Sequence, residues 1–375
     1  MNNAESNWSR VEIDPTTTKS TMEKLEDEAG SEYLFVLPVI VIIGLLGNLA
    51  SLVTILNTRL RRITANQYLI VLTASDSVFL IGMILIIFKV DYWSYHLCVL
   101  VEYVLMASSY VSSWSVVALT IERYIAITHP MKHVKLSHIP RTKIMKYWVP
   151  IPFLLNLIQF ITLTPNTEDP NGRKCAIASG QLQLITEMSD VLLSYVAPCV
   201  IIILLNFIIA STVYRASKGL FTEDKCAEQP LESRSSQRRT GNNNSSSTRI
   251  LLVVPIVYTL LNTPFYLMRI LETLALNLFD SHAFSAQELG DNKIAVFLYN
   301  AAHYLYYINF ASDFLVYAFS SNNFRKSVCL AWTKLMCPSS WQQSQKVLRR
   351  MDMSSQKTCV VRTTSHQTRP NGDPV

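Results

Sequence analysis

The stretch that decides the fold is LCVLVEYVLMASSYVSSWSVVALTIERYIAI, residues 97–127. Its 31 residues exceed the ~20 that a helix needs to cross the apolar core of a bilayer. In lipid, a block of this length satisfies its own backbone hydrogen bonds as a helix. Only 16% of the 375 residues are charged, against roughly 25% in an average soluble protein. The stretch therefore predicts a membrane-spanning helix.

Six further apolar blocks have a similar length. They are Tyr33–Leu56, Tyr68–Val90, Tyr147–Leu163, Ile185–Tyr214, Ile250–Leu278 and Ile294–Phe319. Together the seven blocks predict an all-α membrane protein, a seven-transmembrane helix bundle over residues 33–319. The first block follows 32 residues of polar sequence and has no small-residue cleavage site after it. We expect it to remain as a helix rather than to be removed as a signal peptide.

The distribution of charge predicts the orientation. With the N-terminus outside, 24 of the 33 Lys and Arg residues lie in the inner segments and 8 in the outer ones. This bias is the positive-inside signal of a multi-pass protein, here expected in the plasma membrane. Residues 1–32 then form an acidic extracellular tail, and residues 338–375 a disordered cytoplasmic tail. The outer side has a net charge of −10, which either reflects solvated acidic tails or concentrates cationic ligands.

Short motifs occur in a characteristic order along these blocks. They are Gly47-Asn48, Asp76, Cys98, Glu122-Arg123-Tyr124, Trp148, Cys175, Pro198, Pro264, and Asp313 to Tyr317 followed by Asn323-Phe324-Arg325-Lys326. Their order and spacing resemble the rhodopsin-like family of G-protein-coupled receptors over about residues 33–337. The resemblance implies a receptor that activates an intracellular heterotrimeric G protein, and not an enzyme. No HExxH or GxSxG sequence occurs, and the seven His residues are dispersed.

Cys98 and Cys175 are the only two of the seven cysteines placed on the oxidising outer side. A disulfide between them is the natural pairing, with two free thiols as the alternative. Such a bond would pin the loop after the fourth helix to the top of the third.

The resemblance assigns G-protein coupling and switching to Glu122, Arg123, Tyr124, Met131 and Tyr317. A charge such as Arg123 near the inner membrane face requires a partner or an exit to water. Its long stem lets it turn toward Glu122, and the resemblance implies that local contacts hold it until it is released toward the G protein. Met131 stands where the family places an apolar anchor for that partner; ordinary packing is the alternative.

A carboxylate in the middle of a membrane helix, such as Asp76, is expected to be functional. The family pattern implies that Asn48, Ser112, Asn309 and Asp313 converge on it in a pocket that often holds a sodium ion. Asp313 stands where the family usually has Asn, so two carboxylates would share the site. Two carboxylates so near to each other either bind a cation between them or share a proton, and we favour the cation.

Three residues depart from the family pattern: Phe314 replaces a proline, Asn262 a tryptophan and Asn206 a common tyrosine. They put the details of the switch in question, not the fold. Phe314 at its position is similar to invertebrate neuropeptide receptors of the FMRFamide-type group.

The ligand class is narrowed by exclusion. Leu105 stands where amine receptors have an aspartate, and no lysine for a retinal Schiff base lies within Ile294–Phe319. The remaining polar residues of the outer halves predict a ligand cavity. They are Glu102, Met106, Ser109, Glu187, Asp190, Tyr266, Arg269, Glu272, Tyr299, His303 and Tyr306. Some of them have packing or headgroup contact as an alternative.

The carboxylates of this cavity favour a basic or amidated neuropeptide, because each costs free energy if it faces lipid. A lipid or chemosensory ligand on the same fold is the alternative. A transporter is less favoured, because internal repeats and paired broken helices are not found in the sequence.

Several modification and contact sites lie outside the bundle. Residues 320–337 predict a short amphipathic eighth helix on the membrane lipids, with Cys329 and Cys337 as palmitoylation sites or free thiols. Asn7 begins a glycosylation sequon, and phosphorylated Ser and Thr residues of the C-terminal tail would bind arrestin. The basic residues are scattered between apolar blocks, which disfavours nucleic-acid binding.

Overall fold

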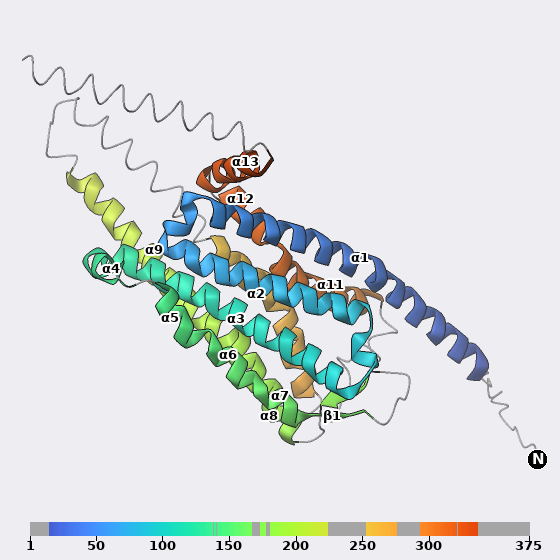
Figure 1. Ribbon diagram of the computed structural model, residues 1–375. Helices are drawn as coiled ribbons and strands as arrows, with labels where there is room; N and C mark the ends of the chain where they lie inside the picture. The colour runs from blue at the N-terminus through green and yellow to red at the C-terminus, as the bar shows by residue number, and fades with distance from the viewer. Residues whose placement is uncertain are drawn as a thin grey trace, which may run out of the picture.

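The computed structural model describes the backbone of residues 15–137, 139, 141–166, 173–177, 181–223, 253–275, 293–320 and 322–336, with most of the side chains from Val36 onward. Asn7, Cys337, the tail 338–375 and most of the third inner loop lie outside these residues. Figure 1 shows the long helices side by side in one bundle. The strand β1 lies at the end where α1 begins, here called the hairpin end, and α4 lies near the opposite end, here called the α4 end.

The first three membrane segments are single long helices. They are α1 (Pro15–Asn57), α2 (Thr64–Ile87) and α3 (Tyr95–Thr128), joined by the 3-10 turns η1 (Arg59–Arg62) and η2 (Val90–Tyr92). The short helix α4 (Pro130–Ser137) follows α3. The fourth segment is divided into α5 (Arg141–Trp148), α6 (Pro150–Leu155), the 3-10 turn η3 (Asn156–Ile158) and α7 (Gln159–Thr162). Pro150 and Pro152 account for this division, because proline cannot donate to a helical carbonyl.

The later segments are also interrupted. A two-stranded antiparallel hairpin, β1 (Leu163–Pro165) with β2 (Cys175–Ile177), precedes the fifth segment. That segment comprises α8 (Gln181–Val191), the π-helical turn η4 (Leu192–Val196) and α9 (Ala197–Glu223). The sixth is the helix Val253–Ala275. The seventh comprises α11 (Lys293–Ala311) and α12 (Asp313–Ser320), and α13 (Asn322–Met336) follows it.

Six of the described helices are long and apolar enough to cross a membrane. They are Val36–Asn57, Thr64–Ile87, Tyr95–Thr128, Lys143–Thr162, Gln181–Arg215 and Val253–Ala275. The seventh predicted block is present as α11 and α12, which are interrupted at Ser312 and rich in Tyr, Asn and His. The predicted all-α bundle is therefore confirmed.

The ends of the helices differ from the ends of the apolar blocks. The helix α1 begins at Pro15 rather than at Tyr33, and α9 continues to Glu223 beyond Tyr214. The apolar pattern marks where a helix lies in lipid, whereas the backbone remains helical beyond the hydrocarbon layer.

The π-helical turn η4 shows how the bundle satisfies the hydrogen bonds of irregular backbone. Pro198 has no N–H group, so one carbonyl of the preceding turn lacks a helical donor. The Tyr258 hydroxyl donates to the carbonyl oxygen of Ser194 at 3.2 Å, and Trp114 Nε1 donates to the carbonyl oxygen of Leu193 at 3.1 Å. Side chains of the sixth segment and of α3 therefore replace the missing donors and join three helices.

A glycine sets the closest packing of α1. A Cβ atom at Gly44 would lie 2.6 Å from Ala311 Cβ and 2.7 Å from Leu80 Cδ1. It would also lie 2.9 Å from Ala311 Cα, which belongs to the backbone of α11. Gly44 thus lets α1 approach α2 and α11 more closely than any other residue would allow.

We predict that Gly44→Ala destabilises the protein by about 1–3 kcal/mol, because the new methyl group forces α1 and α11 apart. The measurement is the thermal unfolding midpoint of the detergent-solubilised protein. Leu49→Ala, at an exposed position of the same helix, is the matched control and should change it little. An unchanged midpoint for Gly44→Ala would contradict the close packing of these helices.

Candidate functional site

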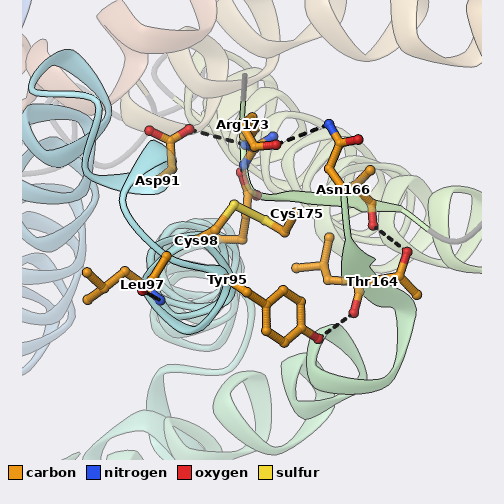
Figure 2. The surroundings of a disulfide bond; sticks show 12 residues. Asp91, Tyr95, Leu97, Cys98, Thr164, Asn166, Arg173 and Cys175 are labelled. Atoms are coloured by element: carbon orange, nitrogen blue, oxygen red, sulfur yellow. Dashed lines mark hydrogen bonds and ion pairs between the residues drawn. A yellow bond between two sulfur atoms is a disulfide. The ribbon is translucent and has the colours of Figure 1, made fainter. Parts of the chain in front are cut away.

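A disulfide covers the hairpin end of the bundle. Cys98, in the first turn of α3, is bonded to Cys175, the first residue of β2, with 5.9 Å between their Cα atoms. Figure 2 shows the bond between the top of α3 and the hairpin, where the Tyr95 hydroxyl donates to the Leu163 carbonyl oxygen at 2.8 Å. The predicted disulfide is confirmed, and it fixes the hairpin over the end of α3.

The pinned hairpin brings a basic residue to two carboxylates. Arg173 lies two residues before Cys175, and its Nε is 3.2 Å from Asp91 Oδ2. Its guanidinium also forms an ion pair with Glu102 of α3. Glu102 therefore shares one guanidinium with Asp91. The sequence alone did not indicate Arg173 as a site residue, although its position close to Cys175 was a signal that could have identified it.

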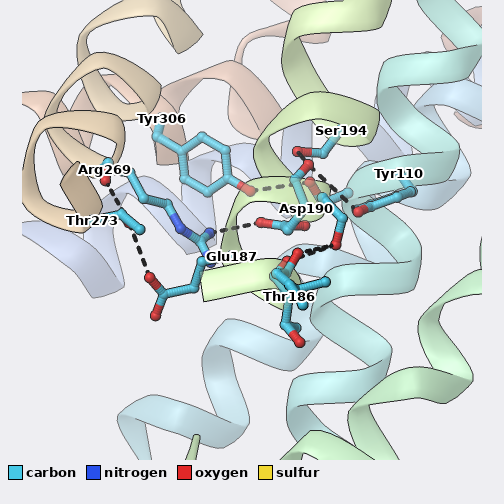
Figure 3. Close-up of polar contacts among 11 residues, drawn as sticks. Tyr110, Thr186, Glu187, Asp190, Ser194, Arg269, Thr273 and Tyr306 are labelled. Carbon is cyan, nitrogen blue, oxygen red and sulfur yellow. Dashed lines mark hydrogen bonds and ion pairs between the residues drawn. The ribbon is translucent and has the colours of Figure 1, made fainter. Parts of the chain in front are cut away.

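A second polar cluster joins α8 to the sixth segment, as Figure 3 shows. Arg269 Nη1 lies 2.9 Å from Asp190 Oδ2, in a pair that is largely buried. One turn earlier on α8, Glu187 accepts hydrogen bonds from the Thr273 hydroxyl at 2.9 Å and from Gln183 Nε2 at 3.0 Å. The predicted neighbours Glu187, Asp190 and Arg269 thus lie together.

Glu272 belongs to the same cluster, because it lies within electrostatic range of Glu187 and Arg269. Asp190 forms an ion pair with Arg269, and the carboxylates of Glu187 and Glu272 lie near the same guanidinium. We call these four residues the acidic cluster; its formal charge is −2. Such a cluster attracts a cationic group.

Aromatic rings lie beside the acidic cluster. Tyr306 shares a hydrogen bond of 3.1 Å with the Ser109 hydroxyl and stacks on Phe265 with 4.2 Å between ring centroids. Tyr266 stacks on Tyr195 at 4.5 Å. The predicted residues Ser109, Tyr266 and Tyr306 therefore come together with two aromatic residues that the sequence did not indicate, Tyr195 and Phe265.

The remaining predicted cavity residues surround these rings. His303 contacts the Phe265 ring edge-on at 5.1 Å and the Tyr299 ring at 4.4 Å. Tyr299 lies within electrostatic range of Glu272. Met106 is half-buried on α3, between Glu102 and Ser109 in sequence.

A small cavity of about 10 Å³ lies deeper in the bundle, about the volume that one water needs. Its polar lining includes Asp76, Ser112, Asn309 and Asp313, four of the five residues expected there. The fifth, Asn48, does not line this cavity, because its amide donates to the Phe310 carbonyl oxygen at 3.0 Å. Thr73, which the sequence did not indicate, donates to Asp313 Oδ2 at 2.9 Å.

The donor set of this cavity fits a cation. Asp76 Oδ1 and Ser112 Oγ are buried and have no hydrogen-bond partner among the described residues. Two carboxylates in one buried site repel each other unless a cation or a proton lies between them. The described residues contain no group of three His, Cys, Asp or Glu side chains that would hold a transition metal.

The structure gives the local surroundings of the three residues that depart from the family pattern. The seventh segment breaks at Ser312 although Phe314 is not proline, and the Ser312 hydroxyl donates to the Asn309 carbonyl oxygen at 3.1 Å. The Phe314 ring contacts that of Phe324 on α13. Asn262 is buried and donates to the Tyr258 carbonyl oxygen at 2.7 Å, whereas Asn206 is half-buried on α9.

At the α4 end, the partner of Glu122 differs from the expected one. Glu122 Oε1 lies 2.9 Å from Arg141 Nη2 and 3.1 Å from His133 Nε2. Among the described side chains, Arg123 forms no ion pair, and its Nε is buried without a hydrogen-bond partner. Glu122 is thus paired with Arg141, and among the described side chains Arg123 forms no ion pair with it.

The other residues expected at this end are separated from one another. Tyr124 contacts the ring of His129, Met131 is 76% exposed on α4, and Tyr317 is buried with its hydroxyl 3.3 Å from that of Thr73. Cys329 is a free, exposed cysteine on α13.

Comparison with known proteins identifies the family. Residues 47–317 match the 7 transmembrane receptor (rhodopsin family). The B1 bradykinin receptor of Canis lupus familiaris is 38% identical over 112 residues, covering 26% of this chain and 30% of that receptor. The somatostatin receptor type 1 of Rattus norvegicus is 22% identical over 341 residues, covering 85% of this chain and 78% of the receptor.

The neurotensin receptor type 1 of Mus musculus is 24% identical over 267 residues, covering 64% of this chain and 58% of the receptor. In these matches the chain spans less than a third of the bradykinin receptor but more than three quarters of the somatostatin receptor. The family match covers most of the helical bundle described above, including the hairpin, the cavity and the seventh segment. The chain therefore belongs to the rhodopsin family of seven-transmembrane receptors.

Proposed function

We propose that this receptor binds a basic peptide at the hairpin end and activates a heterotrimeric G protein at the α4 end. The acidic cluster carries the proposal. Its formal charge of −2 lies in the partly desolvated outer half of the bundle, where an ionic contact with a ligand is screened less than in water. The names of its relatives, receptors for bradykinin, somatostatin and neurotensin, support a peptide ligand.

The geometry of the acidic cluster supports different roles for its carboxylates. Asp190 is already paired with Arg269, so Glu187 and Glu272 are the carboxylates that remain for a guanidinium or ammonium group of the ligand. The half-buried rings of Phe265, Tyr299 and His303 are the ones available to apolar or cationic parts of the peptide, whereas Tyr266 and Tyr306 are buried against neighbouring rings. Arg173 and the disulfide hold the hairpin beside this entrance.

The proposal places the receptor in the plasma membrane with its N-terminus outside. The hairpin end with its disulfide then faces the oxidising exterior, and α4 faces the cytoplasm. The excess of Lys and Arg in the segments at the α4 end supports this orientation. The exposed Cys329 on α13 supports palmitoylation beside membrane lipids. We place the proposed Asn7 glycosylation outside, and arrestin binding on the phosphorylated tail inside.

The ligand proposal is tested in cells with a promiscuous G-protein reporter and a library of amidated peptides that carry Arg or Lys. We predict a saturable response whose half-maximal concentration rises about tenfold to a hundredfold in Glu187→Gln and in Glu272→Gln, as expected for the loss of a charge-assisted contact. Ser189→Ala, at an exposed position of α8, is the matched control and should leave the response unchanged.

A response that is equal for each peptide and its neutral, glutamine-substituted counterpart would contradict the ionic contact. Silence across the library with the receptor confirmed at the cell surface would favour a lipid or chemosensory ligand instead.

We further propose that the deep cavity binds a sodium ion through Asp76, Asp313, Ser112 and Asn309. A bound sodium ion would neutralise one of the two carboxylate charges and give the unpartnered oxygens of Asp76 and Ser112 a ligand. Binding to the folded state alone would stabilise the receptor in proportion to the logarithm of sodium concentration.

We predict that the purified receptor unfolds at a higher temperature in sodium chloride than in N-methylglucamine chloride of equal ionic strength. Asp76→Asn and Asp313→Asn should each abolish this difference. Ser75→Ala is the control, because the Ser75 hydroxyl is bonded to the Leu72 carbonyl oxygen and does not line the cavity. A difference that persists in both Asp variants would place the sodium effect elsewhere.

A further inference from the structure

The helix α4 is not held in place by a buried apolar face. None of the described side chains from Pro130 to Leu136 is buried; Met131 is 76% and Val134 58% exposed. The helix has only eight residues, and isolated helices shorter than about 12 residues are marginal in water. Polar contacts must therefore contribute to its position.

Arg141 provides the contacts at the C-terminal end of α4. Its Nη1 donates to the carbonyl oxygens of Leu136 at 2.7 Å and Ile139 at 3.4 Å. The last carbonyls of a helix have no partner within the helix, and a guanidinium satisfies them while opposing the negative end of the helix dipole. Arg141 thus caps α4 from the first turn of α5.

Glu122 joins this cap to α3. Its Oε1 accepts from Arg141 Nη2 at 2.9 Å and contacts His133 Nε2, in the middle of α4, at 3.1 Å. The Arg141 side chain is 0% exposed, so its charge depends on this carboxylate. One buried glutamate therefore connects the end of α3, two points along α4 and the start of α5.

We propose that Glu122 and Arg141 are positioning residues that hold α4, with its exposed Met131, in the orientation in which a G protein binds it. In this receptor Glu122 restrains α4 rather than Arg123. The inference rests on the proposed coupling to a G protein, but the contacts that carry it are independent of any ligand.

The proposal reverses the expected effect of neutralising Glu122. If Glu122 restrained Arg123, Glu122→Gln would release that arginine and raise ligand-independent signalling. If Glu122 and Arg141 hold α4, the same variant loosens the coupling helix and lowers G-protein activation. Arg141→Gln should then have the same effect, and the double variant should be no worse than either single one.

The direct test is hydrogen exchange of the purified full-length receptor in detergent, followed on the amides of residues 133–137. We expect about tenfold faster exchange in Glu122→Gln and in Arg141→Gln, because each variant removes a charge-assisted contact that holds α4 in place and so limits the opening of its amide hydrogen bonds. Arg141→Lys should give an intermediate rate, since an ammonium group keeps the charge but lacks the fork that reaches both partners. Lys143→Gln, exposed on the same helix, is the matched control.

His133→Leu provides a milder variant, because it removes one tether and leaves the buried ion pair intact. It should give a smaller acceleration, and it keeps the proposal testable if Arg141→Gln does not fold. Unchanged exchange at residues 133–137 in both Glu122→Gln and His133→Leu would overturn the proposal. Unchanged exchange with increased ligand-independent signalling in Glu122→Gln would indicate that Glu122 restrains Arg123 instead of α4.

Exchange that follows the expected pattern while the peptide library gives no reporter signal would support the positioning role of Glu122 and Arg141 and contradict only the proposed peptide ligand. The two proposals therefore fail in different ways.

Discussion

Charges inside the helical bundle must be compensated by other parts of the protein, because lipid and packed side chains offer them no water. The pair of Arg141 with Glu122 is the clearest case: the guanidinium has no exposed surface and its partner lies on another helix. At the opposite end, Arg269 and Asp190 join the fifth segment to the sixth by the same principle. In both places the partner lies far away in sequence, so compensation of charge also determines how the helices are held together.

The backbone follows the same requirement. Pro198 removes a backbone donor, and the Tyr258 hydroxyl of the sixth segment donates to a carbonyl of that turn instead. Where the seventh segment breaks, the Ser312 hydroxyl donates to the Asn309 carbonyl oxygen. These irregular turns lie next to residues of the proposed sites: η4 begins two residues after Asp190, and the break directly precedes Asp313. Irregular backbone is tolerated at membrane depth only where it is buried in protein or lines a cavity. The interruptions are thus part of how the bundle forms its sites.

The two ends of the receptor differ in how completely their charges are compensated. The acidic cluster contains two more carboxylates than guanidiniums, an excess that the proposed basic ligand would balance. At the α4 end Glu122 is shared by Arg141 and His133, whereas Arg123 forms no ion pair among the described residues. The proposed ligand would therefore meet excess negative charge at one end, and the proposed G protein would meet a tethered helix at the other.

The sequence by itself determined the seven membrane segments, their bias of positive charge and the disulfide, because length, hydropathy and the count of outer cysteines are local properties. It also predicted that Glu187, Asp190, Tyr266 and Arg269 belong to one polar cavity in the outer halves of the helices. Only the tertiary structure decided which residue each one meets: Arg141 rather than Arg123 for Glu122, and the Phe310 carbonyl rather than the cavity for Asn48. The physical reason is that periodicity fixes the face of one helix, whereas the depth and rotation of its neighbours come from packing at contacts such as Gly44 against Ala311.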